Sequence, residues 1–234
     1  MAISKRIYLV VGLLAMAAFV FGGCADPADD APPADQRHVP EEAEEPEEEP
    51  EAEPEEEEAR VYYQLTPRTR IGFVGSSPIT GSQRGGFEVF EGTISIADGG
   101  LSTLRAEGVI DAASVQAGSE TLVNALKADI LDVEQYPEIR FTATNVEEDN
   151  GQYTLVGDLE LHGVTREIGF PIESPSIDED SVRMESYFSI SRENWNIYYE
   201  GHGWDPPGWR GAMDDAIRPR VAIQLDLRAE RIED

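Results

Sequence analysis

The chain has 234 residues, with 47 Asp or Glu against 18 Lys or Arg, so its formal net charge is −29. This excess of acidic residues excludes the basic patches that bind nucleic-acid phosphates, and no nucleic-acid partner is expected. Cys24 is the single cysteine, which excludes an intrachain disulfide.

Residues 1–23 have the features of a secretory signal peptide. Lys5 and Arg6 form a positive region, and an apolar run over residues 7–21 is followed by two glycines and Cys24. The run is shorter than a typical membrane-spanning helix. Its end resembles the lipobox of bacterial lipoproteins, which implies cleavage before Cys24 and a diacylglycerol on the Cys24 sulfur. Ordinary cleavage that leaves a free thiol is the alternative.

Residues 24–60 are predicted to be a disordered acidic tether. The run over residues 41–58 is made of Glu, Pro and Ala, so it cannot bury enough apolar surface to offset the entropy of ordering. Its like charges favour an extended chain. A solvated spacer is therefore favoured over a role in scavenging metals or in binding a cationic partner.

Residues 61–234 have the size of one domain, and most of them follow the period-two pattern of β-strands. The clearest case is 153–161, where Tyr153, Leu155, Gly157, Leu159 and Leu161 share one face. Turns are predicted at Asn150-Gly151 and at His162-Gly163. Similar runs occur at residues 61–65, 70–74, 87–96, 104–110, 139–143, 168–172, 182–190 and 221–227, with Phe87 and Val89 among the apolar residues of the third run. About eight antiparallel strands with one apolar face each predict an all-β barrel.

One segment breaks the strand pattern. Leu122, Val123 and Leu126 fall at helical spacing after Ser119, a suitable N-cap, so a short helix is predicted over residues 118–128 at one end of the barrel. Small residues also occur on the inward faces of the strands and would leave cavities in a solid core. They are Gly92, Ala106, Gly108, Ala143, Gly157 and Ser186. An enclosed apolar ligand is therefore the economical hypothesis.

Several segments in order resemble the YceI family of lipocalin-like, polyisoprenoid-binding proteins. They are FEVFEGTI (87–94), residues 108–141, YTLVGDLELHGVTREIGFP (153–171), FSISRENWNIYY (188–199) and residues 214–230. The resemblance covers nearly all of residues 61–234. It implies an eight-stranded antiparallel barrel whose apolar tunnel holds an isoprenoid, quinone or fatty amphiphile, without catalytic residues, cofactor or metal.

Carried over to this chain, the resemblance makes the inward apolar residues candidates for contact with the ligand. They are Phe73, Phe87, Ile94, Leu104, Phe141, Leu155, Leu159, Leu161, Phe170, Phe188, Ile190 and Trp195. Arg192 shares the face of Phe188 and Ile190 and is a candidate head-group contact, bidentate if the head is a phosphate. An ion pair with Glu193, Asp214 or Asp215 is the alternative role for Arg192.

The remaining polar residues point to no established chemistry. His162 lies at a hairpin tip without a second His or Cys at ligand spacing, so a turn histidine is favoured over a metal ligand or an acid–base group. Nucleotide-binding and serine-hydrolase motifs are missing from the sequence. Trp204 and Trp209 lie on a Gly/Pro-rich loop, either as a lid or membrane contact or as a cap on the core.

The sequence therefore predicts a non-enzymatic, membrane-anchored carrier of a long apolar amphiphile in the bacterial cell envelope. A lipoprotein facing the periplasm is expected, with the outer membrane weakly favoured because Ala25 rather than Asp follows Cys24. The alternative is an interaction module with a filled core that presents Trp204 and Trp209 to a partner. Pairing of two barrels into a homodimer is left open.

Overall fold

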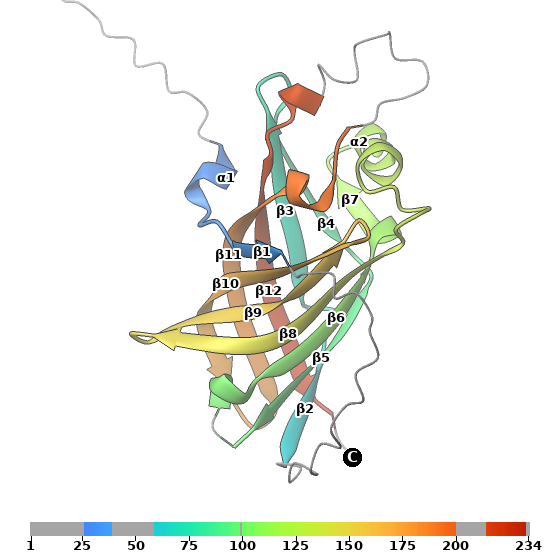
Figure 1. Cartoon of the computed structure of the whole chain (residues 1–234). Helices are drawn as coiled ribbons and strands as arrows, with labels where there is room; N and C mark the ends of the chain where they lie inside the picture. Colours follow the sequence, from blue (N-terminus) through green and yellow to red (C-terminus); the bar gives the residue numbers. More distant parts are fainter. Residues whose placement is uncertain (1–25, 39–58, 99, 200–213, 233–234) are drawn as a thin grey trace, which may run out of the picture.

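The computed structural model describes residues 26–38, 59–98, 100–199 and 214–232, most of which lie in antiparallel strands (Figure 1). The strands are β1 (Asp35–His38), β2 (Arg60–Leu65), β3 (Arg70–Ser77), β4 (Gly81–Phe87), β5 (Phe90–Ala97), β6 (Arg105–Asp111), β7 (Val115–Ala117), β8 (Glu138–Asp149), β9 (Gln152–Leu161), β10 (Val164–Ile177), β11 (Ser181–Ser191) and β12 (Arg220–Arg231). The helical segments are α1 (Pro27–Asp30), η1 (Gly100–Thr103), η2 (Ala112–Ser114), α2 (Glu120–Ala125), the π-type turn η3 (Leu126–Ile130) and η4 (Arg192–Trp195).

The strands close into an antiparallel eight-stranded barrel, which confirms the predicted fold class. Three of its long strands are each broken in two, so that β3 continues β2, β5 continues β4 and β7 continues β6. β8, β9 and β10 follow in order around the wall. β11 pairs with β10 on one side and with β12 on the other, and β12 pairs with both β2 and β3, which closes the ring.

The break between β2 and β3 lies at Pro67, which has no N–H to donate to a neighbouring strand. The side chain of Thr69 takes over the missing backbone pairing with β12. Its hydroxyl donates to the Arg228 carbonyl at 3.0 Å and accepts from the Arg228 N–H at 3.0 Å. The barrel wall therefore stays hydrogen-bonded across the break.

The break between β4 and β5 changes which residues point inward. Phe87 at the end of β4 and Phe90 at the start of β5 both line the interior, although they are three residues apart. Val89 between them is 57% exposed, so its predicted place with the inward apolar residues is wrong. The extra residues at the break shift the alternation by one, which the period-two pattern cannot reveal.

One end of the barrel is closed by core residues. Tyr63 and Ile96 come from the paired strands β2 and β5, and Leu104, Val182 and Ala229 complete this part of the buried core. The Tyr63 hydroxyl donates to the carbonyl of Asp178, in the turn between β10 and β11, at 3.1 Å. This contact links the closed end to a turn that is itself organised by the Asp178 side chain.

We expect this turn to make the barrel less stable in acid. Hydrogen bonds from the Ser181 hydroxyl and from the Asp180 N–H hold the pKa of Asp178 below its usual value. The folded state then binds the Asp178 proton less tightly than the unfolded state, so the stabilisation is present above the unfolded pKa, about 3.9, and is lost as the pH falls through the lower folded pKa. Asp178→Asn should therefore flatten the acid limb of a plot of unfolding free energy against pH, measured by urea titration. An unchanged acid limb would contradict this role.

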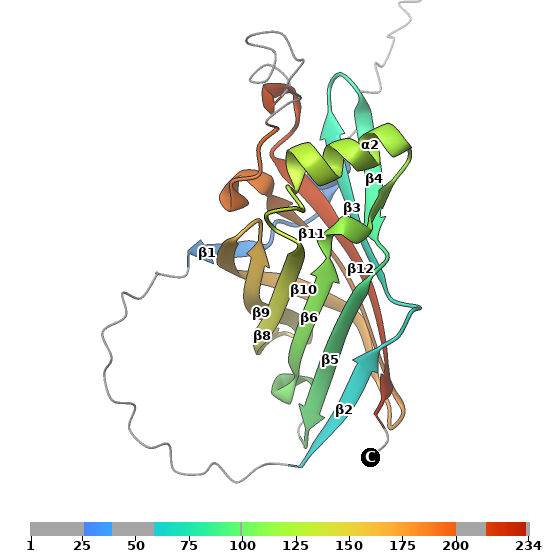
Figure 2. The same cartoon turned by 90° about the vertical axis from the view of Figure 1, so that its right-hand side faces the viewer.

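The other end carries the predicted helix. Its N-cap Ser119 accepts a hydrogen bond from the Leu122 N–H at 3.2 Å, as expected, and the helix continues as the π-type turn η3. Figure 2 shows α2 at this end of the barrel, where it contacts β7. Among the described residues, none of the helices has the length and apolar character needed to cross a bilayer.

Residues 26–38, here called the strap, are folded against the barrel, so the prediction of a disordered tether is wrong for them. β1 pairs with residues 166–169 of β10, and the backbone of Ser189 in β11 exchanges hydrogen bonds with Ala34 and Pro32. The strap thus occupies the seam where β10 and β11 part. Ala28 and Ala31 are buried against Val74, Ala222 and Tyr187. Residues 39–58 lie outside the described residues.

Candidate functional site

An apolar cavity of about 390 Å³ lies inside the barrel. It runs from Leu65 and Leu227 near the closed end to Leu131, Ile197 and Ile217 at the end that carries α2. Nearly all of its surface is apolar, so water in it would find few hydrogen-bond partners. Its size is within the range of ligand pockets.

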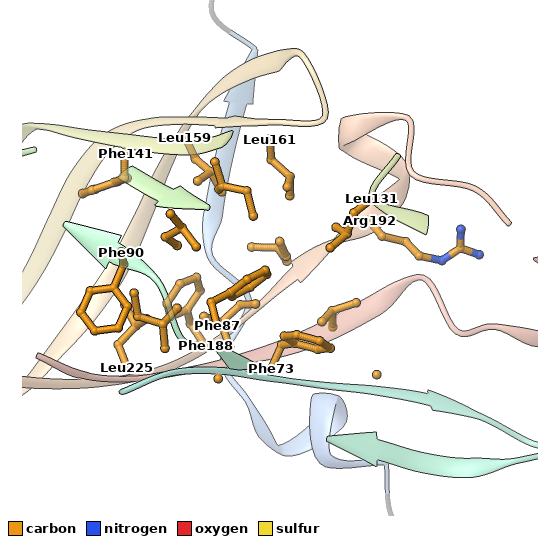
Figure 3. Close-up of a pocket in the computed structure, with 18 of the residues that line it drawn as sticks. Phe73, Phe87, Phe90, Leu131, Phe141, Leu159, Leu161, Phe188, Arg192 and Leu225 are labelled. Carbon is orange, nitrogen blue, oxygen red and sulfur yellow. The ribbon is translucent and has the colours of Figure 1, made fainter. Parts of the chain in front are cut away.

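Aromatic rings form much of the cavity wall (Figure 3). Phe170 stacks on Phe188 with ring centroids 4.5 Å apart, and its ring is tilted against that of Phe141 at 5.5 Å. Phe73 and Phe87 form a second pair at 5.7 Å. These contacts keep the rings in place around an open centre, because each ring packs against its neighbour rather than filling the space between the walls.

Ten of the twelve predicted tunnel residues line this cavity. They are Phe73, Phe87, Ile94, Phe141, Leu155, Leu159, Leu161, Phe170, Phe188 and Ile190. Leu104 does not, because it follows the η1 turn at the closed end and is buried in the solid core there. Trp195 does not either: its ring is fully buried and its Nε1–H donates to the Leu159 carbonyl at 3.2 Å, so it packs against the wall.

Among the lining residues that sequence reasoning missed, two groups show why. Phe90 was missed because the alternation of inward and outward residues shifts between β4 and β5. Leu122, Leu126 and Ile130 come from α2 and η3 and cover the cavity at the helical end. Their helical spacing was visible in the sequence, but the direction of this apolar stripe depends on how the helix packs on the barrel.

The small inward residues have two different roles. Ala106 and Gly108 line the cavity, and a Cβ added at Gly108 would have a single neighbour within 4 Å, the Glu91 carbonyl at 3.8 Å. At Gly157 an added Cβ would lie 2.6 Å from the ring of Phe141 and 2.4 Å from the Thr142 carbonyl. Gly157 therefore accommodates an aromatic ring and leaves no open room. Gly92, Ala143 and Ser186 also lie outside the lining.

Arg192 is buried at the helical end of the cavity, on the turn η4. Its Nη1 forms an ion pair with the Asp214 carboxylate at 2.9 Å, which realises one of the predicted alternatives. Nη1 also donates to the Ile197 carbonyl, and Nη2 donates to the carbonyls of Asp214 and Ile217. Both terminal nitrogens are thus fully used by the protein, so the bidentate phosphate contact considered from the sequence is not open to them.

His162 takes the turn role that the sequence favours. It has φ of 53° and Gly163 has φ of 70°, as a tight hairpin turn requires. Its ring lies 4.2 Å from that of Tyr136, centroid to centroid. Within the described residues, no group of three or more His, Cys, Asp or Glu is arranged to hold a metal ion. Cys24, Trp204, Trp209 and the signal segment 1–23 lie outside those residues.

A model of the YceI-like domain matches residues 63–229 of the chain. Among curated proteins, Protein YceI of Escherichia coli O157:H7 is 31% identical over 100 residues, which cover 42% of this chain and 50% of that protein. A UPF0312 protein of Vibrio campbellii is 30% identical over 92 residues, or 38% and 49% of the two chains. The chain thus spans about half the length of the curated relatives it matches.

Solved structures share the fold at low sequence identity. BcnA of Burkholderia cenocepacia matches with a TM-score of 0.58 at 17% identity, over 68% of this chain and 95% of that one. A polyisoprenoid binding domain from Saccharophagus degradans, described as implicated in plant cell wall breakdown, matches with a TM-score of 0.54 at 17% identity, over 73% and 98%.

Proposed function

Since the chain belongs to the YceI-like family, we propose that it binds a long apolar amphiphile, such as an isoprenoid, quinone or fatty lipid, within its barrel. The observation that carries this proposal is the aromatic-walled cavity, which is continuous through the barrel interior from near the closed end to the helical end. A polyisoprenoid-binding domain with the same fold supports the ligand class.

Burial of apolar surface would supply the binding energy. A linear hydrocarbon chain gains about 25 cal/mol for each Å² removed from water, and about 0.8 kcal/mol for each buried CH₂ group. Selection by polar contacts would then have to come from the few polar groups at the helical end, since the other inward side chains are aliphatic and aromatic and charged residues such as Glu91 and Glu107 are exposed on the outside. The cavity is therefore suited to a molecule that is long, slender and apolar along most of its length.

The cavity weighs against the alternative of an interaction module with a filled core. Such a module would bury Phe73, Phe87 and Phe90 against the opposite wall, whereas these rings border open space. The lining also supports a carrier or sequestering role over catalysis. Its one buried charged side chain in the described part of the chain, Arg192, is already paired with Asp214.

Lipidation of Cys24 would hold the barrel close to a membrane. Asp26 is buried on the barrel, where its carboxylate caps α1 and lies 3.2 Å from Nη1 of Arg218. Arg218 in turn follows Ile217, a lining residue at the helical end of the cavity. Two residues span at most about 7 Å, so an acylated Cys24 would place this end of the barrel next to the bilayer.

Cys24→Ser should release the protein from the membrane. Stable anchoring takes two acyl chains, and without the thiol neither diacylglycerol nor further processing can follow. In fractionated bacterial cells the wild type is expected with the membranes of the envelope and the variant in the soluble fraction. Intact-mass measurement of the wild type should show the added lipid. Membrane association of Cys24→Ser equal to that of the wild type would refute the anchor.

Mass spectrometry of bound lipid tests the proposed function. The chain from Asp26 onward should be purified natively from a bacterial host, because the strap belongs to the fold, and extracted with organic solvent. An isoprenoid, quinone or fatty amphiphile in near-stoichiometric amount is expected. An empty extract that stays empty after incubation with quinones and polyprenols would argue for the interaction module instead.

A further inference from the structure

The guanidinium group of Arg192 has one unused donor. Of its five N–H bonds, four point from Nη1 and Nη2 to Asp214, Ile197 and Ile217. The remaining one, on Nε, is buried and has no hydrogen-bond partner among the described residues. A buried N–H without an acceptor costs stability, and such groups are rare in folded proteins.

Arg192, which carries this donor, is one of the residues that line the cavity. Arg192 is 4% exposed, and its stem continues the inward row of Phe188 and Ile190 along β11. Figure 3 shows it beside Leu131, at the end of the cavity away from Phe90 and Phe141. Other charged residues that border the cavity, such as Glu91, Glu107 and Arg140, are exposed on the outer face of the barrel.

The charge of Arg192 is already neutralised. Asp214 lies 2.9 Å from Nη1, and its carboxylate is fixed by a second hydrogen bond, from the Tyr199 N–H at 2.7 Å. A ligand group at Nε therefore meets an ion pair with no net charge. An anionic group placed there would lose its hydration, gain one hydrogen bond and approach the Asp214 carboxylate.

Building on the proposed function, we infer that Arg192 Nε forms a head-group subsite for a neutral oxygen acceptor, such as the carbonyl or hydroxyl of an isoprenoid quinone or alcohol. The subsite discriminates against phosphate heads. One N–H donor satisfies one acceptor oxygen, whereas a phosphate presents several oxygens and a charge that the Arg192–Asp214 pair cannot balance. The cavity thus selects the uncharged members of a class of lipids that share the same tail.

Asp214→Asn is the variant that tests the charge argument. Both hydrogen bonds to the Asp214 side chain, from Arg192 Nη1 and from the Tyr199 N–H, are accepted by Oδ1. An asparagine Oδ1 in the same place accepts both, so the local geometry is kept while the negative charge is removed. Asp215→Asn is the matched control, because Asp215 is the adjacent residue, is exposed and loses the same charge.

The probes should share one tail: geranylgeraniol, geranylgeranyl monophosphate and the corresponding hydrocarbon without oxygen. Their partition between detergent micelles and protein gives the affinities. Wild type and Asp215→Asn are expected to bind the alcohol at least about tenfold more tightly than the phosphate. Asp214→Asn is expected to bind the phosphate about tenfold more tightly than wild type does, with the alcohol changed less than about threefold.

The outcomes separate the inference from the proposed function. Equal affinity of the wild type for phosphate and alcohol, with the hydrocarbon also bound, would overturn the neutral subsite and leave the carrier function standing. If the wild type binds none of the three probes, the carrier function itself is overturned. If Asp214→Asn fails to fold, the comparison of alcohol and phosphate on the wild type still decides the inference.

Discussion

Replacing Gly108 with phenylalanine is expected to weaken the binding of long apolar molecules while leaving the barrel folded. Gly108 lies on β6 opposite Gly92 and lines the middle of the cavity. An added Cβ there meets open space apart from one carbonyl at 3.8 Å, so the ring can enter the cavity without disturbing the backbone. Phenylalanine also suits a strand, and burying its side chain stabilises by about 1.5–3 kcal/mol.

A bound ligand and the new phenylalanine ring would compete for the same space in the cavity. Overpacking of this kind costs about 1–3 kcal/mol, which corresponds to a loss of about fivefold to 150-fold in affinity. The measurement is the amount of lipid extracted from natively purified variant, together with its thermal unfolding midpoint, which should equal or exceed that of the wild type. Gly157→Phe is unsuitable for this purpose, because its side chain would collide with Phe141 and the Thr142 carbonyl.

Thr142→Phe is the matched control for Gly108→Phe. Thr142 lies on the neighbouring strand β8, pairs with Glu107 and is exposed on the outer face of the barrel. The same ring added there leaves the cavity unchanged, so lipid content should stay at the wild-type level. Retention of wild-type lipid by a folded Gly108→Phe protein would show that the ligand does not occupy this cavity.

The barrel could be predicted from sequence because its strands carry a strong local signal. Along β9, Leu155 and Leu161 are buried and line the cavity as the alternation predicts. Asn150 and Gly151 both adopt positive φ, as their hairpin turn requires. Long strands joined by short turns leave few ways to pair, and closure then follows from the number of strands.

Predictions failed where position depends on distant contacts. Val89 points outward and Phe90 inward, the reverse of what the alternation predicts, because the strand is broken between β4 and β5. The geometry of this break is fixed by the adjoining η2 turn, where the Glu88 N–H donates to the Ser114 carbonyl. Trp195 has the size and apolarity of a lining residue, yet the η4 turn directs it into the wall. In each case a residue of the expected type lies close to the position that the prediction gave it, but on a different face of the wall.

The strap was missed for a different reason. Its composition of Asp, Pro and Ala is typical of a loop, and its buried contacts involve small side chains such as Ala28 and Ala31. What holds it is the backbone of β10 and β11, which part on the N-terminal side of Glu173 in β10 and there offer N–H and C=O groups that do not pair with each other. An exposed strand edge of this kind tends to pair with any extended segment, and here the chain supplies its own.

Ala28→Asp is therefore expected to detach the strap and destabilise the whole barrel. Ala28 is fully buried between Val74, Ala222 and Tyr187, so a carboxylate there would be without a partner in an apolar contact. Avoiding that cost requires the strap to leave the seam. It would then lose the β1 pairing with β10, the two backbone bonds to Ser189 and the Asp26–Arg218 ion pair. A loss of about 2–4 kcal/mol in the free energy of unfolding is expected.

Hydrogen exchange separates detachment from general unfolding, because detachment frees a defined set of amides. In Ala28→Asp the N–H groups of Ala34 and Ser189, which bond across the seam, should exchange faster while those of β9 and β12 stay protected. Ala113→Asp adds the same charge at an exposed alanine and should leave both stability and exchange unchanged. Seam amides in Ala28→Asp that stay as protected as in the wild type would mean that the strap is not what closes the barrel between β10 and β11.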